Sequence, residues 1–448
     1  MKRKYGLILL LISLLLTACG GGSAEDADDL YAPQATEIIS APEADILEQG
    51  PLDAAGSEVL NGEAPPLPSQ GAKVETDRVL SEVAAESSEP LRVDSAGVVA
   101  AEVAQNSQLT AGEVDDNAQW DDYLLYLRDY SGASVLRVDV SERHQILVQD
   151  GQQRPILGAQ VDIMANNQLV TTLRTHSNGR TLFFARAYGI TADEYAVTVT
   201  VNGTTENFVI TAGGSQREWI ITHPGGDQLR GGNRLDVLFL IDATGSMADE
   251  INQLKENIEA IAAQIEALPA QPDVCFGMVT YRDRGDVYVT QVTDFTPDVT
   301  VFAERLAQVQ ADGGGDYPED LNEALSQAVH GVEWRVEETV SLIFLVADAP
   351  PHLDYGQENH YALEMQAATM KGIKIYPIAS SGLDEQGEYI FRQLAQFTEG
   401  RFIFLTYGSE GFGSTGTQTD LNVSDYTVSA LDQLVVRVIE EELAYLVR

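Results

Sequence analysis

The chain has 448 residues, with 27 lysines and arginines against 69 aspartates and glutamates, and a formal net charge of −42 at pH 7. Such an acidic chain has no general attraction for phosphate backbones or anionic lipid headgroups, which excludes broad nucleic-acid binding and a polybasic membrane patch. The two cysteines are too few for a disulfide-stapled scaffold, and the length and the hydrophobic fraction of 44% suit two or three globular domains.

The first segment, residues 1–19, has the pattern of a secretory signal peptide. Basic residues at positions 2–4 precede an apolar run over 7–16 that is too short to span a bilayer as a helix. The sequence Leu-Thr-Ala-Cys that ends at Cys19 resembles the lipobox of bacterial lipoproteins. This resemblance implies cleavage before Cys19 and acyl chains on it that anchor the protein to a membrane. The glycine that follows implies the outer membrane, facing either the periplasm or the cell surface.

The next segment, residues 20–118, is predicted to be a disordered tether. It holds 21 acidic residues against three basic ones, a net charge of −18, and Tyr31 is its only aromatic residue. Because so few apolar groups cannot offset the entropy of ordering the chain, the segment is expected to stay extended and solvated. An acidic interaction tail is the alternative. Residues 109–127 are expected to begin a short ordered lead-in to the folded part.

Residues 119–228 read as an all-β region. Strands are predicted over 135–140, 145–148, 160–164, 180–184 and 195–201, separated by turn signals such as Asp150-Gly151 and Asn202-Gly203. Short strands without a helical period favour an antiparallel β-sandwich. The motifs around residues 148–161 and 175–180 resemble carboxypeptidase-regulatory-like modules, which implies a spacer or a binding surface.

From residue 234 the pattern alternates between buried strands and amphipathic helices. Residues 235–241 form a continuous apolar run, and apolar residues between 251 and 268 recur at spacings of three and four. Further strands are predicted over 274–281, 340–347, 373–379 and 402–405, with helices near 299–310, 318–333, 358–371, 387–398 and 428–446. The alternation predicts a doubly wound, Rossmann-like parallel α/β sheet over residues 234–448.

Oxygen-bearing side chains follow the predicted strands at the end where doubly wound sheets bind ligands. Asp242, Thr244 and Ser246 come directly after the first strand, and Asp348 directly follows the strand 340–347. Oxygen donors without His or Cys suit Mg²⁺, Mn²⁺ or Ca²⁺ rather than Zn²⁺. The alternative is that the first three residues only cap the following helix. His352 is interpreted as a loop residue rather than a ligand.

These loops resemble the metal-ion-dependent adhesion site of von Willebrand factor A domains. The family pattern D-x-[S/T]-x-S matches residues 242–246, and Asp348 matches the family's later acid. The middle loop, Gly-Gly-Gly-Asp-Tyr-Pro-Glu at 313–319, resembles the branch found in hemicentins and alpha-kinase-linked A domains. There the resemblance carries the ligand role to Asp316, in place of the usual threonine, with Asp320 and Glu319 as weaker candidates.

The family resemblance implies a bound divalent cation, usually Mg²⁺, whose coordination is completed by a carboxylate from a protein ligand. The leading hypothesis is therefore a cell-envelope lipoprotein that mediates metal-dependent adhesion or protein–protein interaction, with no catalytic residues. An envelope scaffold that uses the ion for stability is the alternative. A metal-assisted hydrolase is less favoured, because no G-x-S-x-G, H-E-x-x-H or G-x-x-x-x-G-K-[ST] motif occurs.

Overall fold

The computed structural model describes residues 109–213, 216–228, 233–336, 338–409, 416–423 and 426–446. The predicted signal peptide, its lipidation residue Cys19 and residues 20–108 of the predicted tether lie outside this described part. Among the described helices, none is long and apolar enough to cross a bilayer.

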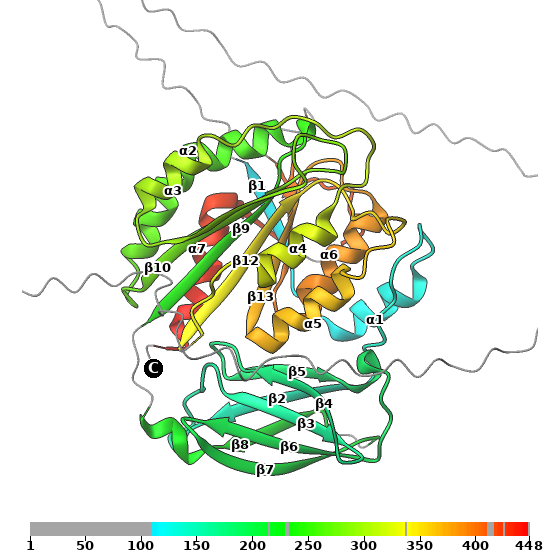
Figure 1. The fold of residues 1–448 in the computed structure, drawn as a ribbon, viewed down its shortest axis with the longest axis vertical. Coiled ribbons are helices and arrows are strands. Elements are labelled where there is room, and N and C mark those ends of the chain that lie inside the picture. The colour runs from blue at the N-terminus through cyan, green and yellow to red at the C-terminus, as the bar shows by residue number, and fades with distance from the viewer. Residues whose placement is uncertain are drawn as a thin grey trace, which may run out of the picture. The chain divides into compact units, whose positions relative to one another are not determined.

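A mixed eight-stranded sheet forms the centre of the C-terminal region (Figure 1). Its strand order is β11-β10-β9-β12-β13-β14-β1-β15, and the strands from β10 to β14 in that order run parallel. The bounds are β1 Thr110–Val114, β9 Arg234–Asp242, β10 Asp273–Tyr281, β11 Thr290–Thr296, β12 Thr339–Ala347, β13 Ile373–Ala379, β14 Phe402–Thr406 and β15 Thr427–Ala430. This confirms the predicted doubly wound α/β fold, with antiparallel strands added at both edges.

The sheet is buried on both faces, which explains the continuous apolar run of β9. Alternate side chains of a strand point to opposite faces, so Leu238 and Leu240 enter one core while Val237, Phe239 and Ile241 enter the other. Helices α4 Leu321–His330, α5 Tyr361–Lys371 and α6 Glu385–Phe397 cover the first face, and α2 Ala248–Glu266, α3 Val299–Leu306 and α7 Leu431–Ala444 cover the second.

The sheet order places the predicted site at a topological switch point. In the sheet, β9 pairs with β10 on one side and with β12 on the other, although β12 comes later in the chain than β10. Loops that follow two such strands turn in opposite directions, and open α/β sheets bind their ligands between them. Asp242 ends β9 and Asp348 directly follows β12. The two acids therefore lie on the two sides of this point.

The segment before the β-rich region differs from its prediction. Residues 110–114 form β1, which is paired between β14 and β15, and helix α1 (Trp120–Asp129) packs on the core that α6 covers. The strand predicted over residues 135–140 does not form: the Leu136 backbone nitrogen donates to the Tyr361 hydroxyl at 2.8 Å, and that hydroxyl donates to the Leu136 carbonyl at 2.9 Å, in place of a neighbouring strand. Residues 110–140 thus belong to the α/β core rather than to the predicted tether or sandwich.

Two smaller sheets follow, with one shared apolar core. One sheet has the order β5-β2-β8 and the other β4-β3-β6-β7. Their bounds are β2 Arg143–Gln149, β3 Gln160–Ala165, β4 Gln168–Arg174, β5 Arg180–Phe184, β6 Glu194–Val201, β7 Thr204–Thr211 and β8 Glu218–Thr222. The likeness of this region to carboxypeptidase-regulatory-like modules stays a prediction.

Candidate metal centre

The loop after β9 brings Asp242 and Thr244 together in the protein interior. Asp242 is fully buried, and its Oδ1 accepts hydrogen bonds from the Thr244 backbone nitrogen at 2.9 Å and from the Thr244 hydroxyl at 2.7 Å. The Ser246 hydroxyl lies 3.4 Å from the Thr244 hydroxyl, at the exposed end of the loop. Asp242 Oδ2 has no hydrogen-bond partner among the described residues. One carboxylate oxygen is therefore buried without a hydrogen bond of ordinary geometry, although the buried Tyr281 hydroxyl is near enough to lower the pKa of Asp242.

A second and a third acid crowd this carboxylate. Burial and, to a smaller extent, the charge of Asp348 raise the pKa of Asp242 to about 7, against hydrogen bonds from Thr244 and Tyr281. Burial likewise raises the pKa of Asp348, against a hydrogen bond from Ser246. Glu319 is buried too, and burial followed by the charge of Asp242 raises its pKa to about 9. The charge of Asp348 thus disfavours the ionised form of Asp242, and the charges of Asp242 and Asp348 disfavour that of Glu319.

The glycine-rich loop directs Glu319, rather than Asp316, toward this cluster. Gly314 has a φ of +78°, and a Cβ built there would lie 3.0 Å from Glu319 Oε1 and 3.2 Å from Thr244 Cβ. Asp316 instead turns outward: its side chain is 65% exposed and its Oδ2 lies 3.7 Å from His352 Nε2. A loop in which glycine is required at 314 therefore brings Glu319 close to the Asp242 loop. The role of Asp316 as a ligand beside Asp242 stays a prediction.

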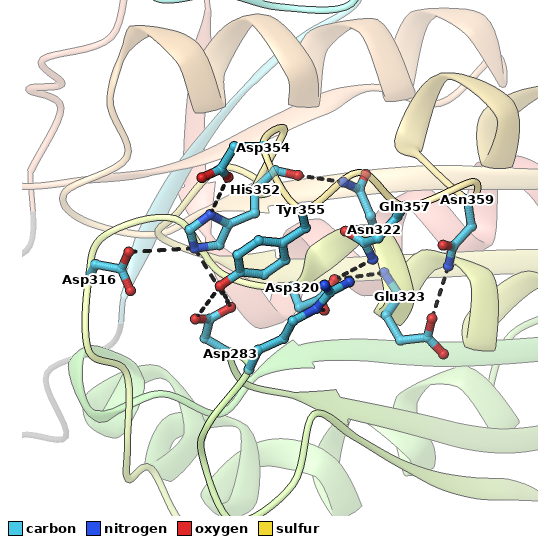
Figure 2. A network of polar contacts seen from close by, with 11 residues as sticks. Asp283, Asp316, Asp320, Asn322, Glu323, His352, Asp354, Tyr355, Gln357 and Asn359 are labelled. Atoms are coloured by element: carbon cyan, nitrogen blue, oxygen red, sulfur yellow. Dashed lines mark hydrogen bonds and ion pairs between the residues drawn. The ribbon is translucent and has the colours of Figure 1, made fainter.

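Asp320, the other weaker candidate, is held by other partners. Its side chain caps α4 by accepting from the Glu323 backbone nitrogen at 3.3 Å. It also accepts from Arg284 at 2.9 Å and from Gln357 at 2.8 Å. Figure 2 shows it on the side of the network away from Asp316. Asp320 therefore caps α4 and connects it to the loops that carry Arg284 and Gln357.

The donors fit a hard divalent cation. Asp242, Asp348 and Glu319 offer carboxylate oxygens and Thr244 and Ser246 offer hydroxyls, the ligand types that Mg²⁺ and Ca²⁺ prefer. The orphaned Asp242 Oδ2 and the raised carboxyl pKa values indicate negative charge that lacks a counter-charge. A divalent ion among these oxygens would supply it.

Replacing Glu319 by glutamine is expected to weaken Mg²⁺ binding by about 10- to 100-fold, because glutamine cannot supply the negative charge that the carboxyl gains when it ionises beside the ion. Isothermal titration of the purified chain with Mg²⁺ measures the change. Asp312→Asn removes an exposed charge from the same loop and is the matched control, with no change expected. Equal Mg²⁺ affinities of wild type and Glu319→Gln would contradict a ligand or near-ligand role for Glu319.

Comparison with known proteins decides the family of this region. The family model of the von Willebrand factor A domain matches residues 236–407. Residues 236–407 form a von Willebrand factor A domain. The A domain starts on β9 and ends just after β14, so it contains Asp242, Ser246, Glu319 and Asp348.

Curated relatives share this A domain over part of their length. The chain is 27% identical over 178 residues to the alpha-protein kinase vwkA of Dictyostelium discoideum, which covers 39% of this chain and 28% of that protein. It is 35% identical over 113 residues to von Willebrand factor A domain-containing protein 7 of Rattus norvegicus, covering 25% of this chain and 12% of that protein. The chain thus spans less than a third of the length of either relative.

A solved structure is also similar, that of proximal thread matrix protein 1 from the mussel byssus. The identity is 16%, the TM-score 0.27, and the match covers 38% of this chain and 45% of that chain.

Proposed function

We propose that this chain is a cell-envelope lipoprotein whose A domain binds a protein partner through a divalent cation, in the first place Mg²⁺. Asp242, Thr244, Ser246 and Asp348 are the ligands proposed for the ion, with Glu319 beside them. The observation that carries the proposal is the buried Asp242 Oδ2, which has no hydrogen-bond partner in the described part of the chain. A bound ion satisfies this oxygen and supplies positive charge that attracts an acidic side chain of the partner.

The location is proposed from the sequence alone. The basic and apolar pattern of residues 1–19 and the lipobox-like sequence before Cys19 support export and acylation. The acidic residues between 20 and 108 repel one another, which favours an extended spacer between a membrane and the folded region. Metabolic labelling with a palmitate analogue tests the anchor: the label should appear on wild type and disappear in Cys19→Ala.

The binding function is tested by metal-dependent cross-linking on intact cells. Partners cross-linked to the wild-type chain in Mg²⁺ are expected to be lost in EDTA and in Asp242→Ala. Asp312→Asn, an exposed acid of the glycine-rich loop, should keep them. Identical partner profiles for wild type and Asp242→Ala would overturn the metal-mediated interaction.

A role of the ion in domain stability is the second candidate function, and the crowding of Asp242, Asp348 and Glu319 favours it. The charges of Asp242 and Asp348 raise the pKa of Glu319, and an ion among these carboxyls offsets that repulsion. An ion that binds only the folded domain stabilises it by about 2.7 kcal/mol at 100 times its dissociation constant. Thermal unfolding in Mg²⁺ and in EDTA separates the two roles. A domain that stays folded in EDTA but loses its partner supports binding, whereas a domain that melts supports a scaffold.

A further inference from the structure

His352 has a buried ring nitrogen that no protein group satisfies. The residue is only 6% exposed, and its Nε2 has no hydrogen-bond partner within the described ranges. Its other ring nitrogen, Nδ1, lies 2.8 Å from Asp354 Oδ1. With its proton on Nδ1, the ring donates to Asp354, and Nε2 then carries a free lone pair. Figure 2 shows this nitrogen directed toward two further carboxylates.

The two carboxylates lie at a distance that suits a shared ion better than a direct hydrogen bond. His352 Nε2 is 3.7 Å from Asp283 Oδ1 and 3.7 Å from Asp316 Oδ2, beyond hydrogen-bond range. One donor atom from each of the three residues lies within 4.8 Å of the others. Ligands bound to Zn²⁺ at roughly 2.0–2.2 Å in tetrahedral geometry are about 3.4 Å apart. Small side-chain rotations therefore suffice to close the three donors around one ion.

The surroundings hold the imidazole and one carboxylate in place. The Tyr355 ring stacks on His352 at 3.9 Å, and its hydroxyl donates to both oxygens of Asp283 at 2.7 and 2.6 Å. Arg284 also lies over the Tyr355 ring, with its guanidinium carbon 4.1 Å from the ring centroid. A carboxylate behind the imidazole and a fixed ring plane are the outer contacts that orient metal-binding histidines.

We propose that Asp283, Asp316 and His352 form a second metal site, specific for a transition-metal ion of the Zn²⁺ type. An imidazole with two carboxylates is a ligand set that suits Zn²⁺ and disfavours Mg²⁺ and Ca²⁺, which take oxygen donors. The site is separate in composition from the all-oxygen cluster around Asp242. Asp316, being largely exposed, gives the ion a route from solvent and leaves a coordination position open.

The second ion would join three loops that surround the first site. Asp283 follows β10, Asp316 lies before α4, and His352 follows β12. The His352 backbone nitrogen also donates to the Glu319 carbonyl at 3.0 Å, which links the two sites through the backbone. Asp316, which the family resemblance assigns to the first site, is here proposed as a ligand of the second site. The other ligands of the two sites differ, so each site is tested separately.

The test is a Zn²⁺ titration of the purified, detergent-solubilised full-length chain, without an affinity tag, in excess Mg²⁺ that saturates the first site. Wild type is expected to bind one Zn²⁺, and His352→Gln and Asp316→Asn are expected to weaken that binding by at least about 100-fold. Asp354→Asn should weaken it by about 10- to 100-fold, because it removes only the partner of Nδ1. Substitution with Co²⁺ should give d–d absorption in wild type that disappears in His352→Gln.

Two controls keep the outcome decisive. Asp312→Asn, exposed in the same loop as Asp316, should bind Zn²⁺ like wild type. Asp242→Ala should lose Mg²⁺ binding and keep the Zn²⁺ site, so failure of the first site is distinguishable from failure of the second. Because Asp316 is exposed, its replacement is not expected to unfold the domain, and circular dichroism checks this. Absence of Zn²⁺ binding in wild type, or Zn²⁺ binding in Asp316→Asn or His352→Gln that is as tight as in wild type, would overturn the proposal.

Discussion

Replacing Arg392 by methionine is expected to lower the free energy of unfolding by about 3–5 kcal/mol, because it leaves buried carboxylates without their cation. Arg392 lies on α6, and its guanidinium donates to Asp116 at 3.0 and 2.6 Å and to Glu388 at 3.2 Å. The side chains of all three residues are 6% exposed or less. The guanidinium carbon also lies 3.8 Å from the Tyr126 ring centroid.

The pKa values of the two acids agree with this expectation. Burial raises the pKa of Asp116, and the hydrogen bond and charge of Arg392 oppose the rise. Burial also raises the pKa of Glu388, with Arg392 again among the opposing groups. Without Arg392, its lowering effect on the pKa of both Asp116 and Glu388 is lost. The loss also removes one link between α6 and the segment that joins β1 to α1, in which Asp116 lies, while the hydrogen bonds between Asn117 and Gln396 remain.

Denaturant-induced unfolding measures this effect. Arg128→Met is the matched control, because Arg128 pairs with Asp129 on the surface and both side chains are about two-thirds exposed. That pair is expected to contribute nothing measurable. A loss in Arg392→Met no larger than in Arg128→Met would show that water or rearranged side chains satisfy Asp116 and Glu388.

Strand–helix order was predictable from the sequence because it depends on local pattern. The buried run at 235–241 and the three–four spacing between 251 and 268 are properties of short windows, and they became β9 and α2. The acids that end two strands were predictable for the same reason. Once the strands are assigned, Asp242 and Asp348 must lie together at the carboxyl end of the sheet, because ligands of open α/β sheets bind beyond the carboxyl ends of parallel strands.

The N-terminal strand was not predictable in this way. Residues 110–114 are only five, they include a glycine and a glutamate, and they follow a long acidic segment. Their partners are β14 and β15, which lie about 300 residues later in the chain. A short strand that is stabilised by neighbours so distant in the chain need not have a strand-like pattern in its own residues. Its composition therefore resembles the predicted tether.

The orientation of side chains in the glycine-rich loop also depends on tertiary structure. The loop passes through positive φ angles at Gly313 and Gly314, and it places Glu319 inward and Asp316 outward. Spacing in the sequence does not distinguish these two acids. The sequence favours His352 as a loop residue with solvent or backbone partners, and the other histidines show no clustered spacing. Its partners Asp283 and Asp316 come from two other loops, so only the fold brings the three together.

Replacing Lys374 by methionine is also expected to cost about 3–5 kcal/mol at pH 7, because Glu442 would become a buried charge without a cation. Lys374 Nζ donates to Glu442 Oε1 at 2.8 Å, and both side chains are under 10% exposed. The Tyr376 hydroxyl donates to the same oxygen at 2.8 Å. Burial alone would raise the pKa of Glu442, but the charge and hydrogen bond of Lys374 hold it below its ordinary value.

The sign of the pH dependence follows from these shifts. In wild type the depressed pKa of Glu442 stabilises the fold above about pH 4.3, the unfolded value, and this contribution is lost as the pH falls through the folded value. The raised pKa of Lys374 contributes stability that is complete below about pH 10.4 and is lost as the pH rises through the folded value. In Lys374→Met burial raises the pKa of Glu442 instead. The cost of ionising Glu442 then grows above about pH 4.3, so the deficit should be small at pH 4 and largest at neutral pH.

Two titratable neighbours of Lys374 also affect the pH dependence of Lys374→Met. Burial raises the pKa of Glu399 and Lys374 opposes this, so loss of the lysine affects Glu399 in the same direction as Glu442. His176 acts differently: burial and then Lys374 lower its pKa to about 3, so removing the lysine makes its protonation easier. A charged His176 would partly replace Lys374 below neutral pH. Lys374→Met is therefore compared with its parent both in wild type and in His176→Gln.

The measurement is the free energy of unfolding of each lysine variant and of its parent, from pH 4 to pH 8. The difference between the two tests whether the deficit comes from the charge of Glu442. In the His176→Gln background the deficit should rise steadily with pH, and adding Glu442→Gln to Lys374→Met should remove most of both the deficit and its pH dependence. Glutamine can still accept from Tyr376, so the double variant retains that hydrogen bond. A deficit that stays constant with pH would mean that Lys374 stabilises the fold through the packing of its aliphatic stem, which charge does not affect.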